Sequence, residues 1–430
     1  MKIVIIGGGF AGLNLAKELL NQKGIHVTLV DKNNYNFFAP LIYQVATAFL
    51  EPSSISYPFR KFFAGKKNLQ FRMGNLLKVN APENKIILNN GELEYDYLVF
   101  ATGAETSYFG MENVKKNAIP MKTLNDAIVM RNTLLKNLEK AAICKDIRER
   151  RKLLTIVVAG GGPTGVEVSG MLAEMRKNIL LKEYSELTTT ASNIYLVDGA
   201  NAVLSPMSKA SQEDTLEALT KLGVVVKLNT TVVDYIDDTV YFANGETIQT
   251  KNLIWAAGVT AKVFEGIPAE SYGRGKRMAT DAFNKVNGTT NIFAIGDTCI
   301  QLTDADFPAG HPQVAQVAIQ QGINLANNFK FMNQKKPLKP FKYNDKGSMA
   351  IIGKNKAVVD LPNPKMHFKG FFAWIIWLFI HLISLITYRN RVKTFFNWMI
   401  AYFAKDQSLR MIIRPDKKVR TELNNIKTNL

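Results

Sequence analysis

The chain has 430 residues, 47% of them hydrophobic and 21% charged, so it can form two or three globular domains. Its net charge is +18, but residues 331–430 hold 19 Lys/Arg and 5 Asp/Glu, which puts +14 of that charge in the tail. Basic residues mixed with aromatic and aliphatic ones fit an anionic membrane surface better than nucleic acid, so no nucleic-acid partner is expected. Two cysteines, Cys144 and Cys299, cannot form a disulfide framework, and no targeting peptide is apparent, so a reducing compartment is expected.

The chain begins with an apolar strand, residues 2–6, followed by the glycine motif Gly7-Gly8-Gly9-Phe10-Ala11-Gly12. In a strand–GxGxxG–helix unit the glycines permit a tight turn, close approach of a pyrophosphate and close packing of helix on strand. The next strand, His26–Val30, ends at Asp31, where a carboxylate can accept bonds from ribose hydroxyls. One such motif alone is also compatible with a tight turn in an unrelated α/β protein.

A charged segment of helical periodicity, residues 123–150, separates this unit from a second one. The second unit has an apolar strand, residues 154–159, and then Gly160-Gly161-Gly162-Pro163-Thr164-Gly165. Its following strand, residues 193–197, ends at Asp198. A carboxylate at that position would repel a 2′-phosphate, so it favours NADH over NADPH.

The two halves are copies of one pattern. Each continues to an Asn-Gly turn, at residues 90–91 and 244–245, and then to an apolar strand that ends in glycine, Gly103 or Gly258. The distance from first to last glycine is 96 residues in the first copy, Gly7 to Gly103, and 98 in the second, Gly160 to Gly258. The repeat predicts an α/β protein with two Rossmann-type dinucleotide-binding domains.

A further buried strand, residues 289–297, delivers Asp297 after both copies. Its carboxylate could bind a polyol such as the ribityl chain of FAD, or it could simply cap a helix. A helix is expected at residues 314–331 and short strands at 341–359. The predicted domains are an FAD-binding domain (1–115 and 255–330), an NADH-binding domain (116–254) and a C-terminal region (331–430).

These residues resemble the two-dinucleotide-binding-domain flavoproteins and, within them, type II NADH dehydrogenase (NADH:quinone oxidoreductase). The resemblance covers nearly the whole chain. It rests on the two glycine motifs, Asp297, the run Asn36–Ala46, Glu167, and the run Ala315–Gly322, which matches the quinone-site pattern AQxxxQxG. The resemblance implies FAD at the first motif, NADH at the second, and Glu167 near the contact of nicotinamide and flavin.

The resemblance assigns roles to individual positions. The cofactor-binding residues it implies are Gly7, Gly9, Phe10, Ala11, Gly12, Asp31, Lys32, Ala101, Thr102, Gly103, Gly160, Gly162, Thr164, Gly165, Glu167, Asp198, Ala257, Gly258, Asp297, Ala315 and Gln316. Glu167, Gln316 and Gln320 are the candidate catalytic residues, and the two glutamines would bond the quinone ring. Each has an ordinary alternative, because a carboxylate is favoured in the first turns of any helix and glutamine amides often cap loops or face water. No histidine spacing suggests a metal, and none is predicted.

The tail has the composition of a membrane-binding helix. Residues 370–387 are almost entirely apolar, yet Trp374, Trp377, His381, Ser384, Tyr388 and Arg391 form a stripe at helical spacing. A second apolar set, Val392, Phe395, Phe396, Met399 and Phe403, precedes the basic residues Arg410, Arg414, Lys417, Lys418 and Arg420. This pattern favours amphipathic helices lying in the plane of the membrane, on an anionic lipid surface at the cytoplasmic face. A spanning helix and a buried helix of a homodimer remain alternatives.

The expected activity is transfer of hydride from NADH to FAD and of electrons from reduced FAD to a membrane quinone, without proton pumping. The first alternative is a related flavin-dependent NAD(P)H reductase with another acceptor, although the two cysteines form no redox pair. The second is a redox-inactive NAD-binding module at the membrane.

Overall fold

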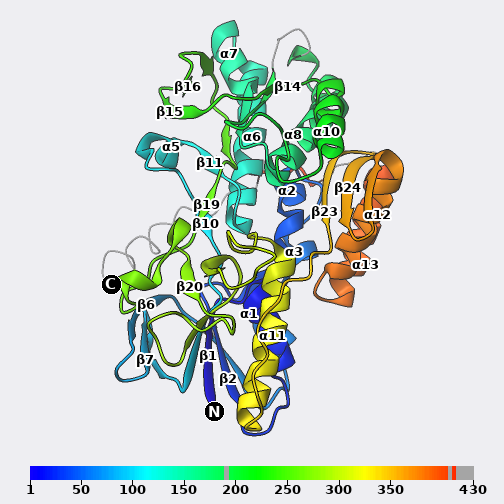
Figure 1. Ribbon diagram of the computed structural model, residues 1–430. Helices are drawn as coiled ribbons and strands as arrows, with labels where there is room; N and C mark the ends of the chain where they lie inside the picture. Colours follow the sequence, from blue (N-terminus) through cyan, green and yellow to red (C-terminus); the bar gives the residue numbers. More distant parts are fainter. Residues whose placement is uncertain (188–192, 405–408, 413–430) are drawn as a thin grey trace.

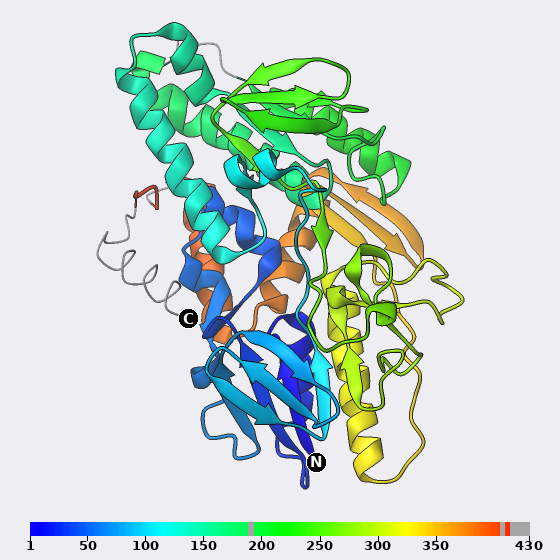
Figure 2. The ribbon, with the colours of Figure 1, turned by 90° about the vertical axis from the view of Figure 1, so that its left-hand side faces the viewer.

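A computed structural model describes residues 1–187, 193–404 and 409–412 of the chain. Two α/β units stand one above the other, with the C-terminal elements beside their junction (Figures 1 and 2). Each unit is built on a five-stranded parallel sheet. The predicted fold class is therefore confirmed.

The sheet of the first unit has the strand order β21-β9-β1-β2-β5. The strand bounds are Lys2–Ile6 (β1), His26–Asp31 (β2), Leu69–Met73 (β5), Tyr97–Phe100 (β9) and Ile292–Ala294 (β21). Alternate residues of β1 enter different cores, Ile3 and Ile5 on one face and Val4 and Ile6 on the other. Because both faces are covered, the strands are continuous apolar runs, as parallel sheets require.

Helices cover one face of this sheet and an antiparallel meander covers the other (Figure 1). The helices are α1 (Phe10–Glu18) and α11 (Ala315–Asn333), and the meander comprises β6 (Leu76–Asn80), β7 (Lys85–Leu88) and β8 (Gly91–Glu94). Helix α11 packs tightly on α1 at Gly322, where an added Cβ would lie 2.5 Å from the carbonyl oxygen of Ala11. The helix predicted at 314–331 and the Asn90-Gly91 turn, between β7 and β8, are confirmed.

The second unit repeats this arrangement with the order β11-β18-β12-β13-β14. Its strands are Ile119–Pro120 (β11), Ile156–Ala159 (β12), Ile194–Val197 (β13), Val224–Lys227 (β14) and Leu253–Trp255 (β18). Its meander is β15 (Val232–Ile236), β16 (Thr239–Phe242) and β17 (Thr247–Gln249), and its helices are α6 (Leu124–Ile143), α7 (Ile147–Leu154), α8 (Pro163–Met175) and α10 (Lys209–Lys221). The Asn244-Gly245 turn joins β16 to β17, so the internal repeat is a repeat of structure.

The chain crosses between the units twice, and the two crossings pair with each other. They are the short antiparallel strands β10 (Glu105–Thr106) and β19 (Val259–Thr260). The chain then returns to the first sheet, where β21 lies beside β9. Strand β18 continues to Trp255, one residue beyond the boundary expected at 254/255. The domain boundaries themselves stay a prediction.

The C-terminal region contacts both units. Its elements are β23 (Ser348–Gly353), β24 (Lys356–Pro362), β25 (Lys365–Lys369), α12 (Gly370–Ser384) and α13 (Tyr388–Ala404). Strand β23 packs on α8 so closely that a Cβ at Gly170 would overlap the carbonyl oxygen of Ile352. Helix α13 packs on α3 (Pro52–Ile55) in the first unit, where the amide of Asn390 donates to the carbonyl of Ser54 at 2.8 Å. None of the helices in the described ranges is both long enough and apolar enough to cross a membrane.

Several short strands and helices connect the main elements. They include β3 (Tyr35–Phe37), β4 (Ser56–Pro58), α2 (Ile42–Ala46), α4 (Phe59–Phe62), α5 (Glu112–Asn117), β20 (Met278–Thr280) and β22 (Cys299–Gln301). Helix α2 packs between α6 and α8 and carries the run Ile42–Ala46 into the junction of the units.

Candidate functional site

The first glycine loop leaves no room for side chains where it turns. Gly7 has φ 103°, and a Cβ there would overlap the carbonyl oxygen of Ala101. A Cβ at Gly12 would overlap the carbonyl oxygen of Gly7. At Gly9, the N-cap of α1, an added Cβ meets nothing within 4 Å. The loop is therefore closed on its protein side and open in front of the helix N-terminus, where a phosphate would be favoured by the unpaired amides and the helix dipole.

The second loop has the same geometry. Gly160 has φ 113°, and a Cβ there would lie 2.5 Å from the carbonyl oxygen of Ala256. A Cβ at Gly165 would overlap the carbonyl oxygen of Gly160, whereas one at Gly162 meets nothing within 4 Å. Gly162 is the N-cap of α8, with Pro163 as the first helical residue. The chain thus contains two equivalent cradles for a pyrophosphate.

Each cradle has a carboxylate at its edge. The Asp31 carboxylate accepts bonds from the amides of Gly8 and Asn33, both at 2.7 Å. Asp198 accepts from the amide of Gly161 and, at 2.6 Å, from that of Ala200. Burial raises the pKa of Asp31. The bonds from the two amides and the charge of the neighbouring Lys32 oppose this rise in the pKa. Each carboxylate therefore accepts a bond from the second residue of its glycine loop, Gly8 or Gly161. This is the position from which the motif binds a ribose.

The end of strand β21 reaches the same edge of the first sheet. A Cβ at Gly296 would lie 3.2 Å from the Cβ of Ala11 in α1. The next residue, Asp297, lies 3.7 Å from Nζ of Lys122, and its carboxylate is 21% exposed. The parallel pairing of β21, β9 and β1 thus brings Asp297 close to the first glycine loop, although nearly 300 residues separate them in sequence.

Two buried hydroxyls at this edge lack partners within the described part of the chain. They are Oγ1 of Thr102, just after β9, and Oγ1 of Thr298, just after Asp297. A buried polar atom without a partner is costly, so such atoms often face a ligand. Together with the open glycine cradle, they fit an extended polar cofactor such as FAD along the carboxyl ends of the strands. The counterpart segment of the second unit, Ala257-Gly258, follows β18 in the same way.

Glu167 is deeply buried in α8, one helical turn after the second glycine loop. Its side chain lies among the backbone of Ile351 in β23, the indole of Trp377 in α12 and the phenol of Tyr43. Burial raises the pKa of Glu167 well above its usual value, and Ile351 and Trp377 oppose this only in part. Burial therefore favours the neutral form of this carboxyl over the ionised form. The sequence singled out Glu167 and Trp377, and Tyr43 lies in the run Asn36–Ala46, but no pattern predicted that these three side chains meet.

His381 belongs to the same cluster. Its ring stacks on Trp377 with centroids 3.8 Å apart, and its Nδ1 is 2.8 Å from the carbonyl oxygen of Trp377. Burial lowers the pKa of His381 to about 4, so the imidazole is neutral at physiological pH. The predicted stripe is divided between two helices: Trp377 and His381 in α12 face the protein, whereas Tyr388, the first residue of α13, is 80% exposed.

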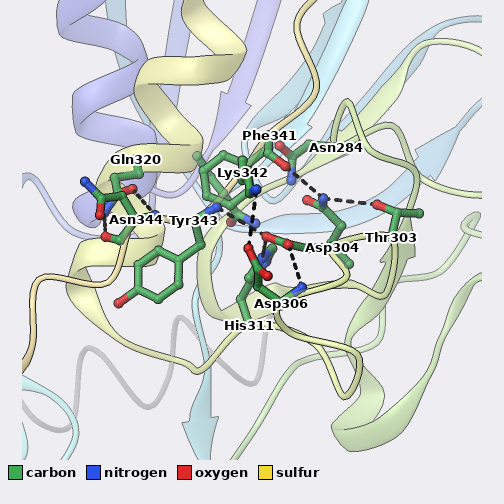
Figure 3. Close-up of polar contacts among 12 residues, drawn as sticks. Asn284, Thr303, Asp304, Asp306, His311, Gln320, Phe341, Lys342, Tyr343 and Asn344 are labelled. Carbon is green, nitrogen blue, oxygen red and sulfur yellow. Dashed lines mark hydrogen bonds and ion pairs between the residues drawn. The ribbon is translucent and has the colours of Figure 1, made fainter. Parts of the chain in front are cut away.

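The two candidate quinone ligands already have protein partners. Gln316 exchanges bonds with the backbone of residues 346–347, donating to Gly347 at 2.7 Å and accepting from Lys346 at 3.0 Å. Gln320 does the same with Asn344, at 2.9 and 3.0 Å (Figure 3). Both amides lie on one face of α11, as their spacing predicts, and both hold the segment 344–347. Their role toward a quinone stays a prediction.

A buried hydrogen bond between a histidine and an aspartate, which no sequence pattern indicated, fixes the start of that segment (Figure 3). Nε2 of His311 lies 2.9 Å from Oδ2 of Asp304, which also accepts from the amide of Tyr343 at 3.3 Å. Burial opposes ionisation of Asp304, but the bonds from His311 and the Tyr343 amide lower its pKa. Phe341, Tyr343 and Phe307 pack around the imidazole. No motif marks these residues, because the pair forms only when the 301–314 loop meets residues 341–343.

The C-terminal helices expose large apolar side chains. Phe372 is 75% exposed, Phe379 60% and Phe403 71%. Of the basic residues predicted to meet lipid headgroups, Arg410 instead forms a two-pronged ion pair with Glu183, with one bond at 2.8 Å. Arg414, Lys417, Lys418 and Arg420 lie outside the described residues. In the described ranges no cluster of His, Cys, Asp or Glu could hold a metal ion.

Comparison with known proteins decides the family. Residues 1–322 match the family model of pyridine nucleotide-disulphide oxidoreductases, and residues 346–406 match that of the NDH2 C-terminal domain. The type II NADH:quinone oxidoreductase NdhA of Mycobacterium tuberculosis is 35% identical over 421 residues, which cover 94% of this chain and 87% of that protein. The chain therefore belongs to the type II NADH:quinone oxidoreductase family.

Other relatives agree with this family. The type II NADH:quinone oxidoreductase Ndh of Mycobacterium tuberculosis is 32% identical, covering 99% of this chain and 93% of that protein. Among solved structures, NDH2 from Plasmodium falciparum in complex with NADH superposes with a TM-score of 0.87 at 24% identity, covering 96% and 99% of the two chains. The sulfide:quinone oxidoreductase of Aquifex aeolicus shares the fold at a TM-score of 0.69 and 19% identity, covering 94% of this chain and 96% of that one.

Proposed function

We propose that this chain oxidises NADH and passes the electrons through bound FAD to a membrane quinone. The observation that carries the proposal is the pair of matched glycine cradles, each with its own carboxylate, in a chain of this family. Two dinucleotide sites in one chain allow one to hold a cofactor and the other to exchange a substrate. We assign FAD to the first cradle because Asp297, Thr102 and Thr298 extend that site beyond the pyrophosphate.

The side chains and backbone of the chain have distinct tasks in this scheme. The N-termini of α1 and α8 bind the two pyrophosphates through the amides around Gly9 and Gly162. Asp31 and Asp198 orient the two adenosine riboses, and Asp198 disfavours a 2′-phosphate. Bound FAD supplies the two-electron chemistry that links a hydride donor to a quinone. Lys32, Ala101, Gly103, Thr164, Ala257, Gly258 and Ala315 are proposed to line the two cofactors.

Glu167 is proposed to hold a proton for quinone reduction. It lies at the junction of α8, β23 and α12, where Trp377 and Tyr43 shield its carboxyl from water and burial raises its pKa. A quinone needs two protons as well as two electrons to become a quinol, and a carboxyl in its protonated form can donate one of them. Gln316 and Gln320 are proposed to contact the quinone ring, in exchange for some of their bonds to residues 344–347.

Membrane attachment is proposed to use α12 and α13 lying in the membrane plane at the cytoplasmic face. The exposed Phe372, Phe379 and Phe403 supply apolar contacts with the acyl boundary. The remaining basic charge of the tail would attract anionic headgroups. Truncation before Gly370 should abolish turnover of long-chain quinone in vesicles.

Anaerobic stopped-flow spectroscopy tests the proposed reaction. The purified protein should be yellow, NADH should bleach its flavin absorbance, and a menaquinone or ubiquinone analogue should restore it. Bleaching without restoration by any quinone would point to a reductase with another acceptor. Absence of bleaching would favour a redox-inactive NAD-binding protein and refute the proposal.

A further inference from the structure

A large cavity lies beside the C-terminal helices, apart from both glycine cradles. It has a volume of about 810 Å³ and is bounded by α8, the β23–β24 hairpin, α12 and α13. Most of its wall is aliphatic or aromatic, as at Met171, Ile351, Leu378 and Trp398. The volume is within the range of roughly 300–1,000 Å³ found for small-molecule sites. Neither the residues assigned above to FAD and NADH nor Gln316 and Gln320 line it, so it is separate from the sites proposed for them.

One edge of the cavity is cationic. It is lined there by Lys177, in the π-helical turn Arg176–Leu180 that follows α8, and by Lys354 and Lys356 in the β23–β24 hairpin. Glu174 is the acidic residue among the lining side chains, so the lining carries a formal charge of +2 even if that carboxyl is ionised. The Glu174 carboxylate accepts a bond from the backbone amide of Lys354, which leaves the ammonium group of that lysine for other partners.

The position of Lys354 connects the cationic edge to the aromatic wall. Its Nζ lies 3.9 Å from the ring centroid of Tyr402 and donates to the Tyr402 carbonyl oxygen at 3.0 Å. The Tyr402 ring in turn packs at 5.4 Å from the indole of Trp374. Lysine beside tyrosine and tryptophan is the arrangement found where membrane proteins meet the headgroup region. Lys354 remains exposed in this arrangement and can meet an anion.

The apolar wall continues onto the surface proposed to face the membrane. Phe371, Phe379 and Phe403 line the cavity and are also 48%, 60% and 71% exposed. A ligand can therefore enter along α12 and α13 from a lipid phase without crossing polar surface. The ligand that fits is an amphiphile with a long apolar part and an anionic head.

We propose that this cavity binds one anionic phospholipid. Its phosphate contacts Lys354, Lys356 and Lys177, and an acyl chain lies along the wall formed by α12 and α13. A quinone has a neutral head group that gains little from three ammonium groups, and the positive charge of a zwitterionic lipid opposes its approach to them. The site rests on the membrane attachment proposed above and gives it lipid specificity, because the lipid joins the membrane helices to the second dinucleotide unit.

Native mass spectrometry of the FAD-loaded, delipidated full-length protein in a neutral detergent tests the site. Phosphatidylglycerol should bind with one lipid per chain and at least about tenfold more tightly than phosphatidylcholine of the same acyl composition. The double variant Lys354→Gln/Lys356→Gln should weaken phosphatidylglycerol binding by about tenfold or more. The matched control, Lys116→Gln/Lys140→Gln, removes the same charge from exposed positions on α5 and α6 and should leave binding unchanged.

A second variant tests the cavity without changing charge. Ala401 lines it, so Ala401→Trp should fill it and abolish lipid binding while NADH oxidation with a water-soluble acceptor stays at the wild-type rate. Equal binding of the two lipids, or binding insensitive to the lysine variants, would overturn the proposal. So would loss of co-purified quinone, or a change from dimer to monomer, in Ala401→Trp, since the occupant would then be quinone or a second copy. Failure of the proposed function would appear separately, as absence of flavin bleaching in the wild type.

Discussion

The two dinucleotide units share one backbone arrangement at the glycine loop and differ in what covers it. In the first unit α1 is covered by α11, which packs at Gly322 against Ala11. In the second unit α8 is covered by β23, which packs at Gly170 against Ile352. Helix α11 brings Gln316 and Gln320 to the first unit. In the second unit, α12, which follows strands β23–β25, brings Trp377 against Glu167. The repeated loop therefore carries the proposed binding of both dinucleotides, and the unique covering layers carry the proposed chemistry and membrane contact.

The largest effect is expected from blocking one loop at a time. Gly9 and Gly162 have φ −71° and extended ψ, and an added Cβ meets no protein atom within 4 Å, so valine is compatible with folding at both. Gly9→Val should yield folded but colourless protein. Gly162→Val should keep its flavin yet slow flavin reduction by NADH by about a hundredfold or more, because a small misplacement of the reactants is that costly.

Bound-flavin absorbance, thermal unfolding and stopped-flow reduction distinguish these results. The assignment of the two loops would be reversed if Gly162→Val lost its flavin and Gly9→Val retained it. Gly273→Val provides a control for valine at a glycine of extended backbone, because Gly273 has φ −107° and an added Cβ there lies 3.4 Å or more from its nearest neighbours.

The second prediction concerns the two carboxylates. Asp198→Ala should lower kcat/KM for NADH by roughly tenfold to a hundredfold, since a hydrogen bond to a charged group contributes about 1.5–3 kcal/mol. The value for NADPH should change less, so the preference for NADH narrows. Asp31→Ala should weaken FAD binding and leave the NADH/NADPH ratio of the flavin-loaded fraction unaltered. Steady-state kinetics with both nucleotides measure this, and equal wild-type values of kcat/KM would contradict it.

A smaller effect, on quinone turnover, is expected at α11, the helix that covers only the first unit. Gln316→Ala and Gln320→Ala should each reduce quinone turnover by about threefold to tenfold, the effect of one lost neutral hydrogen bond, while flavin reduction by NADH stays near the wild-type rate. Asn324→Ala is the matched control, because Asn324 on the same helix also donates to a backbone carbonyl, that of Lys339 at 3.3 Å. Stopped-flow measurements of the two half-reactions separate the effects. Slower flavin reduction with normal quinone kinetics would contradict the quinone role.

The smallest effect is expected on stability, where strands β24 and β25 pack against α10 of the second unit. His367 in β25 lies 2.9 Å from Asp214 of α10 and 3.0 Å from Asp360 of β24, beside the ion pair of Lys369 with Asp214. Partial burial opposes the charge on His367, but the two carboxylates raise its pKa above the usual 6.5. Burial likewise opposes ionisation of Asp214 and Asp360, yet their hydrogen-bond partners lower the pKa of each below 3.8.

The pH dependence follows from these directions. A raised histidine pKa stabilises the fold fully below about pH 6.5 and less as pH rises through the folded-state value, whereas the lowered aspartate pKa values stabilise it above about pH 4. His367→Gln should therefore lower the urea midpoint most near pH 5–6 and least near pH 9. His26→Gln, at an exposed histidine of β2, is the control. A destabilisation by His367→Gln that grows with pH would refute the charged state of His367.

Local pattern was sufficient to predict both binding units. The GxGxxG motifs, the strand-ending Asp31 and Asp198 and the Asn-Gly turns are short-range features, because glycine φ angles, strand alternation and helix starts depend on neighbouring residues. The sequence also predicted a late buried strand that ends at Asp297, and the structure places that strand, β21, beside β9 in the first sheet. The family resemblance extended this to the cofactors and to Glu167.

Tertiary structure decided the environment of those residues. The burial of Glu167 depends on Ile351 and Trp377, which lie 184 and 210 positions further along the chain, and nothing in the α8 sequence indicates it. The bonds of Gln316 and Gln320 to residues 344–347, the Asp304–His311 pair and the lysine-edged cavity likewise need segments that meet only after folding. Desolvation and hydrogen-bond partners come from distant parts of the chain, so the sequence alone predicted the two glycine loops, and packing determined the burial and contacts of the side chains around them.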